Sequence, residues 1–413
     1  MVELPPGWLQ SAGRIIERLD ALFEIGRDAG TNRPGLGEGE QHAHDLVAGW
    51  MHEAGLAVTV DRAGNLWGRA AGADPSLPEV WSGSHLDTPP DGGRFDGALG
   101  VVTALEAATA IEASGGARRT IAVVAFRLEE GPRFGRGVFG SRALFGELEA
   151  DEADLVDADG VTLGEAFTAL GLGESLPSEA ILDRAPACFV EAHIEQGPSL
   201  AAQGATLGVV ASIAGMAGIE IVFAGRRGHA GTVPMDLRSD ALGAAAGFVR
   251  RVHDAARSLP GAVATVGRLD VSPGATNTIP GRVELFADLR APDGDRLDAL
   301  VAAASSAARH AADGASCQVE VVPRWRYEPV AMDLEPSDAL RRAIARAGFE
   351  PVELPSGAGH DAAITASAGV PSGMLFVRSD AEGVSHAPEE ATGADAVAAA
   401  VGVLEAALRE LAA

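Results

Sequence analysis

Residues 80–88 read Val-Trp-Ser-Gly-Ser-His-Leu-Asp-Thr, an apolar run that ends in polar side chains. The run over 80–86 has the length of a buried strand. His85 lies near the end of this run, and Asp87 follows directly after it. The two side chains can bind a metal ion or orient one of its ligands. In an open α/β sheet, ligands bind at the carboxyl ends of the strands. The stretch therefore predicts a strand that delivers chemically active groups to a site.

Segments of helical spacing and segments of strand length alternate on both sides of this stretch. Such alternation is typical of an α/β layer with a largely parallel sheet. The order and spacing of these segments favour one sheet with helices packed on it. The predicted helices cover 8–24, 39–54 and 97–113, and the predicted strands cover 120–128, 188–194 and 373–377.

The pattern changes between about residues 214 and 326. There the expected order is β-α-β-β-α-β, with strands near 219–224, 264–271, 282–290 and 318–324 and helices near 237–258 and 295–312. That order is typical of a split βαβ, ferredoxin-like unit, which can fold on its own. We therefore predict a catalytic domain over 1–213 and 327–413, with an inserted α+β domain over 214–326.

The composition excludes several classes of protein. With 413 residues, 47% hydrophobic and 22% charged, the chain is long enough for two globular domains. Its net charge of −26 argues against nucleic acid and anionic membranes as partners. All basic residues are arginine, which rules out a lysine Schiff base or P-loop. Two cysteines and a start without a secretory signal predict a cytoplasmic protein.

Metal-competent side chains follow several of the predicted strands. Besides His85, they include Asp96 before a small-residue helix, His193 in the predicted strand over 188–194 and His386 near the end of the chain. Imidazole and carboxylate suit zinc, manganese or cobalt. Asp96 is the natural bridge between two ions, and Asp87 can fix the tautomer of His85. By contrast, His42, His44, His52, His253 and His310 lie on helical segments outside these motifs and are predicted to be solvated.

The adjacent pair Glu129-Glu130 ends the apolar run over 121–126. Paired glutamates alone are more often a solvated turn. Adjacent residues at a strand end point in different directions, however, so one can bind a metal ion while the other faces a substrate. Their place at the end of a buried strand favours this functional interpretation.

Together with the strand-end motifs, four further motifs make the chain similar to the M20 metallopeptidase family, and within it to the amidase branch. That branch holds N-carbamoyl-L-amino-acid hydrolases, allantoate amidohydrolases and β-ureidopropionases. The motifs are His-Ile-Glu-Gln-Gly-Pro at 193–198, Gly-His-Ala-Gly-Thr at 228–232, Asn-Thr-Ile-Pro at 277–280 and Ser-Gly-Ala-Gly-His-Asp-Ala at 356–362. The first of these marks the amidase branch, because peptidases of the wider family usually carry an acidic ligand at the position of His193.

The resemblance implies a di-metal aminopeptidase-like α/β/α catalytic domain with an inserted lid and dimerisation domain. It also implies two divalent ions per subunit, Zn, Mn or Co. One ion would be held by His85 and His193 and the other by Glu130 and His386, with Asp96 as the bridge. A homodimer acting on a small, carboxylate-bearing ureido substrate is expected.

The resemblance also assigns roles to side chains that do not bind metal. Glu129 would be the general base, and His229 would stabilise the oxyanion. Asp87 would fix the tautomer of His85. Gln196 would contact the ureido group. Asn277 and Arg290 would clamp the substrate carboxylate, helped by the amide of Gly359. In this family, the residues at the positions of His229, Asn277 and Arg290 commonly reach the site from the partner subunit.

Several substrates remain open on the sequence alone. Hydrolysis of an N-carbamoyl-L-amino acid comes first, allantoate second, N-carbamoyl-β-alanine third, and an acylated amino acid or dipeptide fourth. A protein of another class, which binds metal without turnover, would not need a base such as Glu129.

Overall fold

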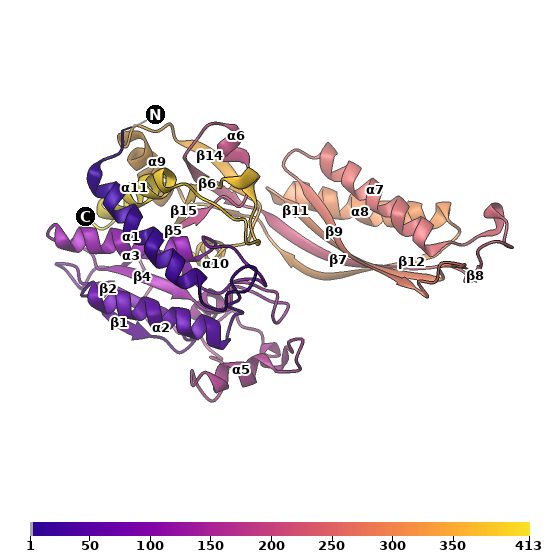
Figure 1. The fold of residues 1–413 in the computed structure, drawn as a ribbon, viewed down its shortest axis with the longest axis horizontal. Helices are drawn as coiled ribbons and strands as arrows, with labels where there is room; N and C mark the ends of the chain where they lie inside the picture. The colour runs from indigo at the N-terminus through magenta and orange to yellow at the C-terminus, as the bar shows by residue number, and fades with distance from the viewer. Residues whose placement is uncertain (1–2) are drawn as a thin grey trace. The chain divides into compact units, whose positions relative to one another are not determined.

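The computed structural model describes residues 3–413, which form two compact units (Figure 1). Unit 1 holds the chain up to Ala211 together with Ala331–Leu354 and Gly359–Ala413. Unit 2 holds Ser212–Val330 and the short return Pro355–Ala358. The segment predicted as an insert, 214–326, falls inside unit 2, whereas the short return was not predicted. No helix within the described residues is long and apolar enough to cross a membrane.

Unit 1 is organised around a nine-stranded sheet with the order β1-β2-β4-β3-β5-β15-β6-β13, in which β14 also pairs with β6. The four central strands β4, β3, β5 and β15 run parallel. Every residue in them is buried, as expected for parallel strands covered on both faces. The strands are β1 Ala57–Val60, β2 Leu66–Ala70, β3 Val80–His85, β4 Ile121–Phe126, β5 Cys188–Ile194, β6 Leu207–Ile213, β13 Val330–Ala331, β14 Val352–Ser356 and β15 Ser372–Val377.

Helices cover both faces of this sheet. The long helix α11 contacts α1, α3 and α9, and all four helices share one apolar core with Leu375 of β15. The next residue, Phe376, contacts His360 at the start of α10, so strand alternation puts α10 on the opposite face. This arrangement confirms the predicted α/β class. The helices are α1 Pro6–Phe23, α2 Glu38–Glu53, α3 Ala98–Ala113, α4 Phe139–Phe145, α5 Leu163–Ala169, α6 Ser199–Ala202, α9 Leu334–Arg346, α10 Asp361–Ser367 and α11 Ala394–Leu411, with single 3-10 turns at Glu152–Asp154 (η1) and Ala381–Gly383 (η3).

Unit 2 carries a four-stranded antiparallel sheet with the order β12-β7-β11-β9, and α7 and α8 pack on it around a second apolar core. Order and connectivity match the predicted ferredoxin-like pattern. Helix α7 begins four residues later than predicted because Asp240 accepts hydrogen bonds from the amides of Leu242 and Gly243 and so caps it. The elements are β7 Gly215–Ala224, β8 Gly228–His229, η2 Met235–Leu237, α7 Ala241–Ser258, β9 Val263–Ser272, β10 Thr278–Ile279, β11 Arg282–Ala291, α8 Gly294–Gly314 and β12 Gln318–Tyr327.

One of the histidines predicted to be solvated is buried. His44 lies on the inner side of α2 with 3% of its surface exposed, and neither ring nitrogen has a hydrogen-bond partner. Burial holds its pKa well below the ordinary value, with repulsion from Arg127 as the second cause. The prediction was wrong because a neutral imidazole can pack as an apolar ring, so its residue type alone does not place it at the surface.

A buried ion pair links α2 to the end of β4. Arg127 and Glu40 are almost completely buried and lie 3.0 Å apart. The carboxylate of Glu40 also accepts hydrogen bonds from the amides of Leu36 and Leu128, at 2.7 Å and 2.8 Å. Leu128 has a left-handed backbone (φ 47°) and directly precedes Glu129. Glu40 thus stabilises a strained turn beside the paired glutamates.

Replacing Glu40 by alanine should lower the free energy of unfolding by about 3–5 kcal/mol, because Arg127 would keep a buried charge without its partner. Urea unfolding followed by circular dichroism measures this. Glu38→Ala, at an exposed position in the same helical turn, should change stability by no more than about 0.5 kcal/mol. Equal effects of the two substitutions would show that the buried pair contributes little.

Candidate metal centre

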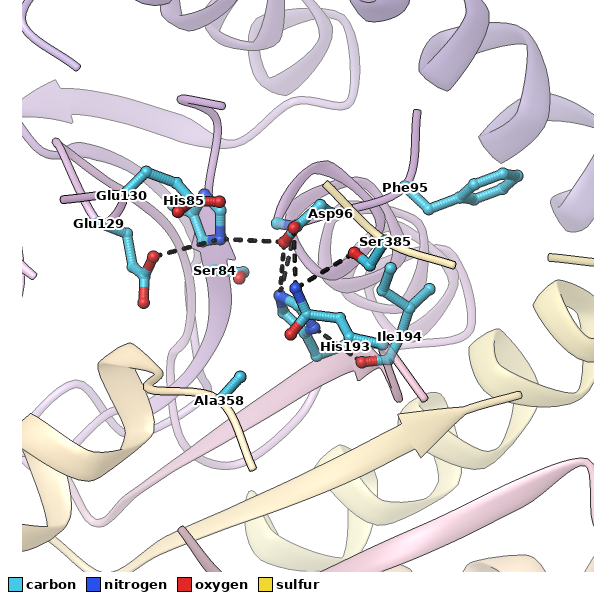
Figure 2. Close-up of polar contacts among 12 residues, drawn as sticks. Ser84, His85, Phe95, Asp96, Glu129, Glu130, His193, Ile194, Ala358 and Ser385 are labelled. Atoms are coloured by element: carbon cyan, nitrogen blue, oxygen red, sulfur yellow. Dashed lines mark hydrogen bonds and ion pairs between the residues drawn. The ribbon is translucent and has the colours of Figure 1, made fainter. Parts of the chain in front are cut away.

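Five predicted ligands of unit 1 come together at the carboxyl edge of the central strands. His85 ends β3, Glu130 follows β4, and His193 is the last but one residue of β5. Asp96 lies two residues before α3, and His386 lies in the loop after η3. Figure 2 shows Asp96 between the imidazole of His85 and that of His193.

The two carboxylate oxygens of Asp96 face different groups of ligands. Oδ1 lies 3.6 Å from Nε2 of His85 and 3.2 Å from Nε2 of His193. Oδ2 lies 3.1 Å from Nε2 of His386, which is itself 3.3 Å from Oε1 of Glu130. The result is two three-residue groups, each able to hold one ion, that share Asp96.

These distances fit divalent ions. Ligand atoms at about 2.0–2.1 Å from a tetrahedral ion lie about 3.3 Å from one another, and the measured separations run from 3.1 Å to 3.6 Å. A carboxylate that gives one oxygen to each ion is also the usual bridge of a two-metal centre. The donor set of imidazoles and carboxylates suits zinc, manganese and cobalt alike.

Hydrogen bonds at Nδ1 leave Nε2 of two imidazoles directed at Asp96. Nδ1 of His193 lies 2.9 Å from the carbonyl oxygen of Ile194, and Nδ1 of His85 lies 3.1 Å from the carbonyl oxygen of Asp87. A proton on Nδ1 makes Nε2 the metal-binding nitrogen. Gly97 leaves room for this arrangement, because a Cβ there would lie 2.4 Å from the ring of His85.

Asp87 orients the backbone of both paired glutamates. Its carboxylate accepts hydrogen bonds from the amides of Glu129 and Glu130, at 3.1 Å and 2.9 Å. In addition, Oδ1 lies 3.4 Å from Nδ1 of His85. A single buried carboxylate therefore connects one histidine ligand with the loop that carries Glu129 and Glu130.

Glu129 lies beside the ligands without belonging to either group. Its Oε2 is 3.8 Å from Nε2 of His85. Burial raises the pKa of Glu129 well above its ordinary value, and repulsion from Glu130 adds to this while His85 opposes it. A carboxyl group whose pKa is raised binds a proton more readily, which suits a group that takes a proton and later returns it.

The crowding of buried carboxylates also changes the pKa values of several predicted metal ligands. Burial, followed by repulsion from Asp96, raises the pKa of Glu130 to about 7. A hydrogen bond to Asp96 raises the pKa of His386 to about 9. Burial alone would raise the pKa of Asp96, but hydrogen bonds from three histidines hold it well below the ordinary value.

The remaining predicted substrate residues are distributed over both units. In unit 1, Nε2 of Gln196 lies 2.9 Å from Oδ2 of Asp96, and Gly359 directly precedes His360 at the start of α10. In unit 2, His229 of β8 pairs with Thr278 of β10, so Asn277 is its neighbour, and both side chains are exposed.

Arg290 lies at the other end of unit 2. It is eight residues beyond Arg282 along β11, a distance of about 26 Å at 3.3 Å per residue. Asn277 precedes Arg282 by five residues on the far side. Asn277 and Arg290 of one copy therefore cannot bind the same carboxylate. The clamp expected from both residues of the partner subunit does not fit this separation, and the two residues would have to come from different copies.

Three buried residues that support the centre were not predicted. Glu390 accepts hydrogen bonds from the amides of Phe95 and Asp96. Glu191 accepts hydrogen bonds from the hydroxyl of Ser84 and the amide of Ala362. Arg33 is almost completely buried, and its guanidinium donates to the carbonyl oxygen of Leu86. Only the position of Glu191 within a predicted strand offered a signal, since a charged residue in a buried run needs a partner.

Histidine and carboxylate ligands gathered at the carboxyl edge of a mostly parallel sheet are the arrangement of a metal-dependent hydrolase of the α/β class. Residues 81–410 match Peptidase family M20/M25/M40. The chain belongs to this family.

Individual relatives show which members of the family this chain is similar to. An N-carbamoyl-L-amino acid amidohydrolase of Geobacillus stearothermophilus is 40% identical over 91% of this chain and 93% of its own length. A probable allantoate deiminase of Oryza sativa is 35% identical over 93% of this chain and 85% of its own. An amidase of the hydantoinase/carbamoylase family from Burkholderia multivorans matches with a TM-score of 0.89 and 33% identity, over 100% of this chain and 98% of that one.

Metal affinity should rise with pH between about 7 and 9. Below pH 9, His386 carries the proton that its raised pKa retains, and an incoming ion must displace it. Each displaced proton makes affinity change by up to ~10-fold per pH unit. Calorimetric titration with Mn²⁺ in buffers of different ionisation enthalpy measures both quantities. His310→Ala, at an exposed histidine of α8, is the control. An affinity independent of pH would remove His386 from the ligand set.

Proposed function

We propose that this protein hydrolyses the carbamoyl group of N-carbamoyl-L-amino acids and releases the amino acid, carbon dioxide and ammonia. The observation that carries the proposal is Asp96, whose two oxygens each face a separate ligand group, with Glu129 beside them. The N-carbamoyl-L-amino acid amidohydrolase relative, 40% identical over most of both chains, supports the choice of substrate.

The two ions would be held by His85 and His193, and by Glu130 and His386, with Asp96 between them. When bound, they supply the Lewis acidity that polarises the ureido carbonyl group and lowers the pKa of a water molecule. Zinc, manganese and cobalt all fit this donor set.

The protein's own side chains would move the protons. Glu129 takes a proton from the water that attacks the ureido carbon. It then delivers that proton to the amino nitrogen as the C–N bond breaks, so the amino acid leaves as a neutral amine. The carbamate that remains decomposes to carbon dioxide and ammonia. Gln196 would orient the ureido group, and His229 would stabilise the oxyanion of the intermediate.

A homodimer is part of the proposal. The substrate carboxylate would be bound by Arg290 and the amide of Gly359, while His229 and Asn277 would act from a second copy. The separation of about 26 Å along β11 supports this division, because one copy cannot bring both ends of unit 2 to one substrate. A cytoplasmic setting is proposed on the two cysteines, which form no disulfide.

The first test offers metal-loaded protein three substrates side by side: N-carbamoyl-L-amino acids, N-carbamoyl-β-alanine and allantoate. We expect ammonia from the first, abolished by a chelator and restored by Mn²⁺ or Co²⁺. Release from allantoate instead would favour the reaction named for the rice relative. If metal is bound and none of the three substrates releases ammonia, the proposal is refuted.

Glu129→Gln should lower kcat by about 10²–10⁴-fold while two ions remain bound, because the substitution removes the base and keeps the shape. Metal content by mass spectrometry and ammonia release measure the two effects. Glu174→Gln, at an exposed glutamate, is the matched control. A Glu129→Gln variant with full activity would end the assignment of the base.

Co-expression of two inactive variants tests the composite site. His229→Ala and Arg290→Ala should each be nearly inactive as homodimers. A purified heterodimer of the two should recover about half of the wild-type activity, since one of its two sites is intact. A heterodimer without activity would mean that the His229 and the Arg290 that serve one substrate come from the same copy.

A further inference from the structure

Glu390 is buried four residues after His386, and it belongs to neither ligand group. Only 5% of its surface is exposed. Oε1 accepts hydrogen bonds from the backbone amides of Phe95 and Asp96, at 2.6 Å and 3.1 Å. Oε2 accepts a hydrogen bond from the hydroxyl of Ser385, at 2.7 Å. One carboxylate therefore joins two loops that are almost 300 residues apart in the chain.

Each of the two loops carries one member of the same ligand group. The first loop carries Asp96, and the amide that donates to Glu390 is its own. The second carries His386, next to Ser385, with a left-handed backbone (φ 54°) and a side chain that is 51% exposed. A short loop with an exposed histidine has little packing to define its place, so the hydrogen bond at Ser385 matters most there.

The protein makes room for this carboxylate. Gly93 lies against Glu390, and a Cβ at Gly93 would fall 2.2 Å from its Cδ. Ser385 also lies 3.3 Å from Nε2 of Gln196, which in turn contacts Asp96. Glu390, Asp96, Gln196 and Ser385 therefore form a closed ring of contacts that includes one metal ligand and lies next to His386 in the chain.

The charge of Glu390 acts in both directions, since it attracts Arg33 and His386. It repels Asp96, and burial together with this repulsion raises the pKa of Glu390. What the position requires is one oxygen for two amides and a second polar atom for the hydroxyl of Ser385. A glutamine offers both, since its carbonyl oxygen accepts from the amides and its NH₂ group donates to Oγ of Ser385.

We propose that Glu390 is a positioning residue that sets the separation between Asp96 and His386, and so tunes the affinity of the ion between them. The proposal rests on the two-metal centre of the proposed function and adds a determinant outside its ligands. The ion held by His85 and His193 should be less affected. It shares Asp96 with the other ion, but its two histidine ligands make no hydrogen bond to Glu390.

The test compares Glu390→Ala and Glu390→Gln with the wild type and with Glu389→Ala, its exposed neighbour. Calorimetric titration with Mn²⁺ gives the affinity of each site, and electron paramagnetic resonance reports magnetic coupling between two bridged ions. We expect Glu390→Ala to weaken one site by about 10–100-fold and to lose the coupled signal. Its kcat should fall with KM nearly unchanged. Glu390→Gln should stay within about threefold of the wild type, as should Glu389→Ala.

Three outcomes would overturn the proposal. They are two ions bound by Glu390→Ala with wild-type affinity, an equal loss of both ions, and a Glu390→Gln variant as impaired as Glu390→Ala. If Glu390→Ala does not fold, Ser385→Ala decides. It removes the hydrogen bond between Ser385 and Glu390, together with the longer contact to Gln196, and leaves both backbone amides bound to Glu390. Weakening of one ion supports the proposal, and unchanged affinity refutes it. A wild-type protein that binds two coupled ions but releases no ammonia would refute the proposed function alone.

Discussion

The rest of the structure depends on one constraint, namely that several carboxylate groups are buried close together at the candidate metal centre. Asp87, Asp96, Glu130, Glu191 and Glu390 are all at most 9% exposed. Such a group of carboxylates is costly unless cations or donors compensate it. Arg33, buried beneath them, is attracted to Asp87 and Asp96 and supplies one fixed positive charge. The histidines supply more when protonated, and divalent ions would supply still more, so the architecture favours metal binding before any substrate is considered.

Backbone conformation at the centre follows from the same demand. Leu128, Gln196 and His386 all have left-handed backbones, although none is glycine. Such conformations cost free energy and persist where the surroundings stabilise them. Here the stabilising groups are side-chain acceptors: Glu40 accepts from the amide of Leu128, and the hydroxyl of Ser379 from that of Gln196. The ligands and the base are thus held by polar contacts from elements remote in sequence.

The strands and their terminal ligands could be predicted from the sequence because both leave a linear signal. An apolar run of strand length followed by His85 or by Glu129 is visible without any structure. The supporting residues are not visible in this way. Glu390 and Arg33 lie in loops, where a charged residue is ordinary, and His44 has a residue type that says little about burial. The separation of Asn277 from Arg290 was within reach of the sequence, because the predicted strand over 282–290 already puts the two residues at opposite ends. It was missed because the clamp was assigned from the motifs alone, without the length of that strand.

The place where unit 2 leaves the chain of unit 1 has a consequence for the history of the protein. The exit follows β6 and the return comes at β13, and these strands are neighbours, with the amide of Met332 donating to the carbonyl oxygen of Ala211. The strands β6 and β13 can therefore pair in the large sheet whether the chain between them is long or short. An ancestral gene could acquire most of this module in one insertion, between the codons of two residues that lie side by side in the large sheet. Only the short return at Pro355–Ala358 comes from a different part of the chain.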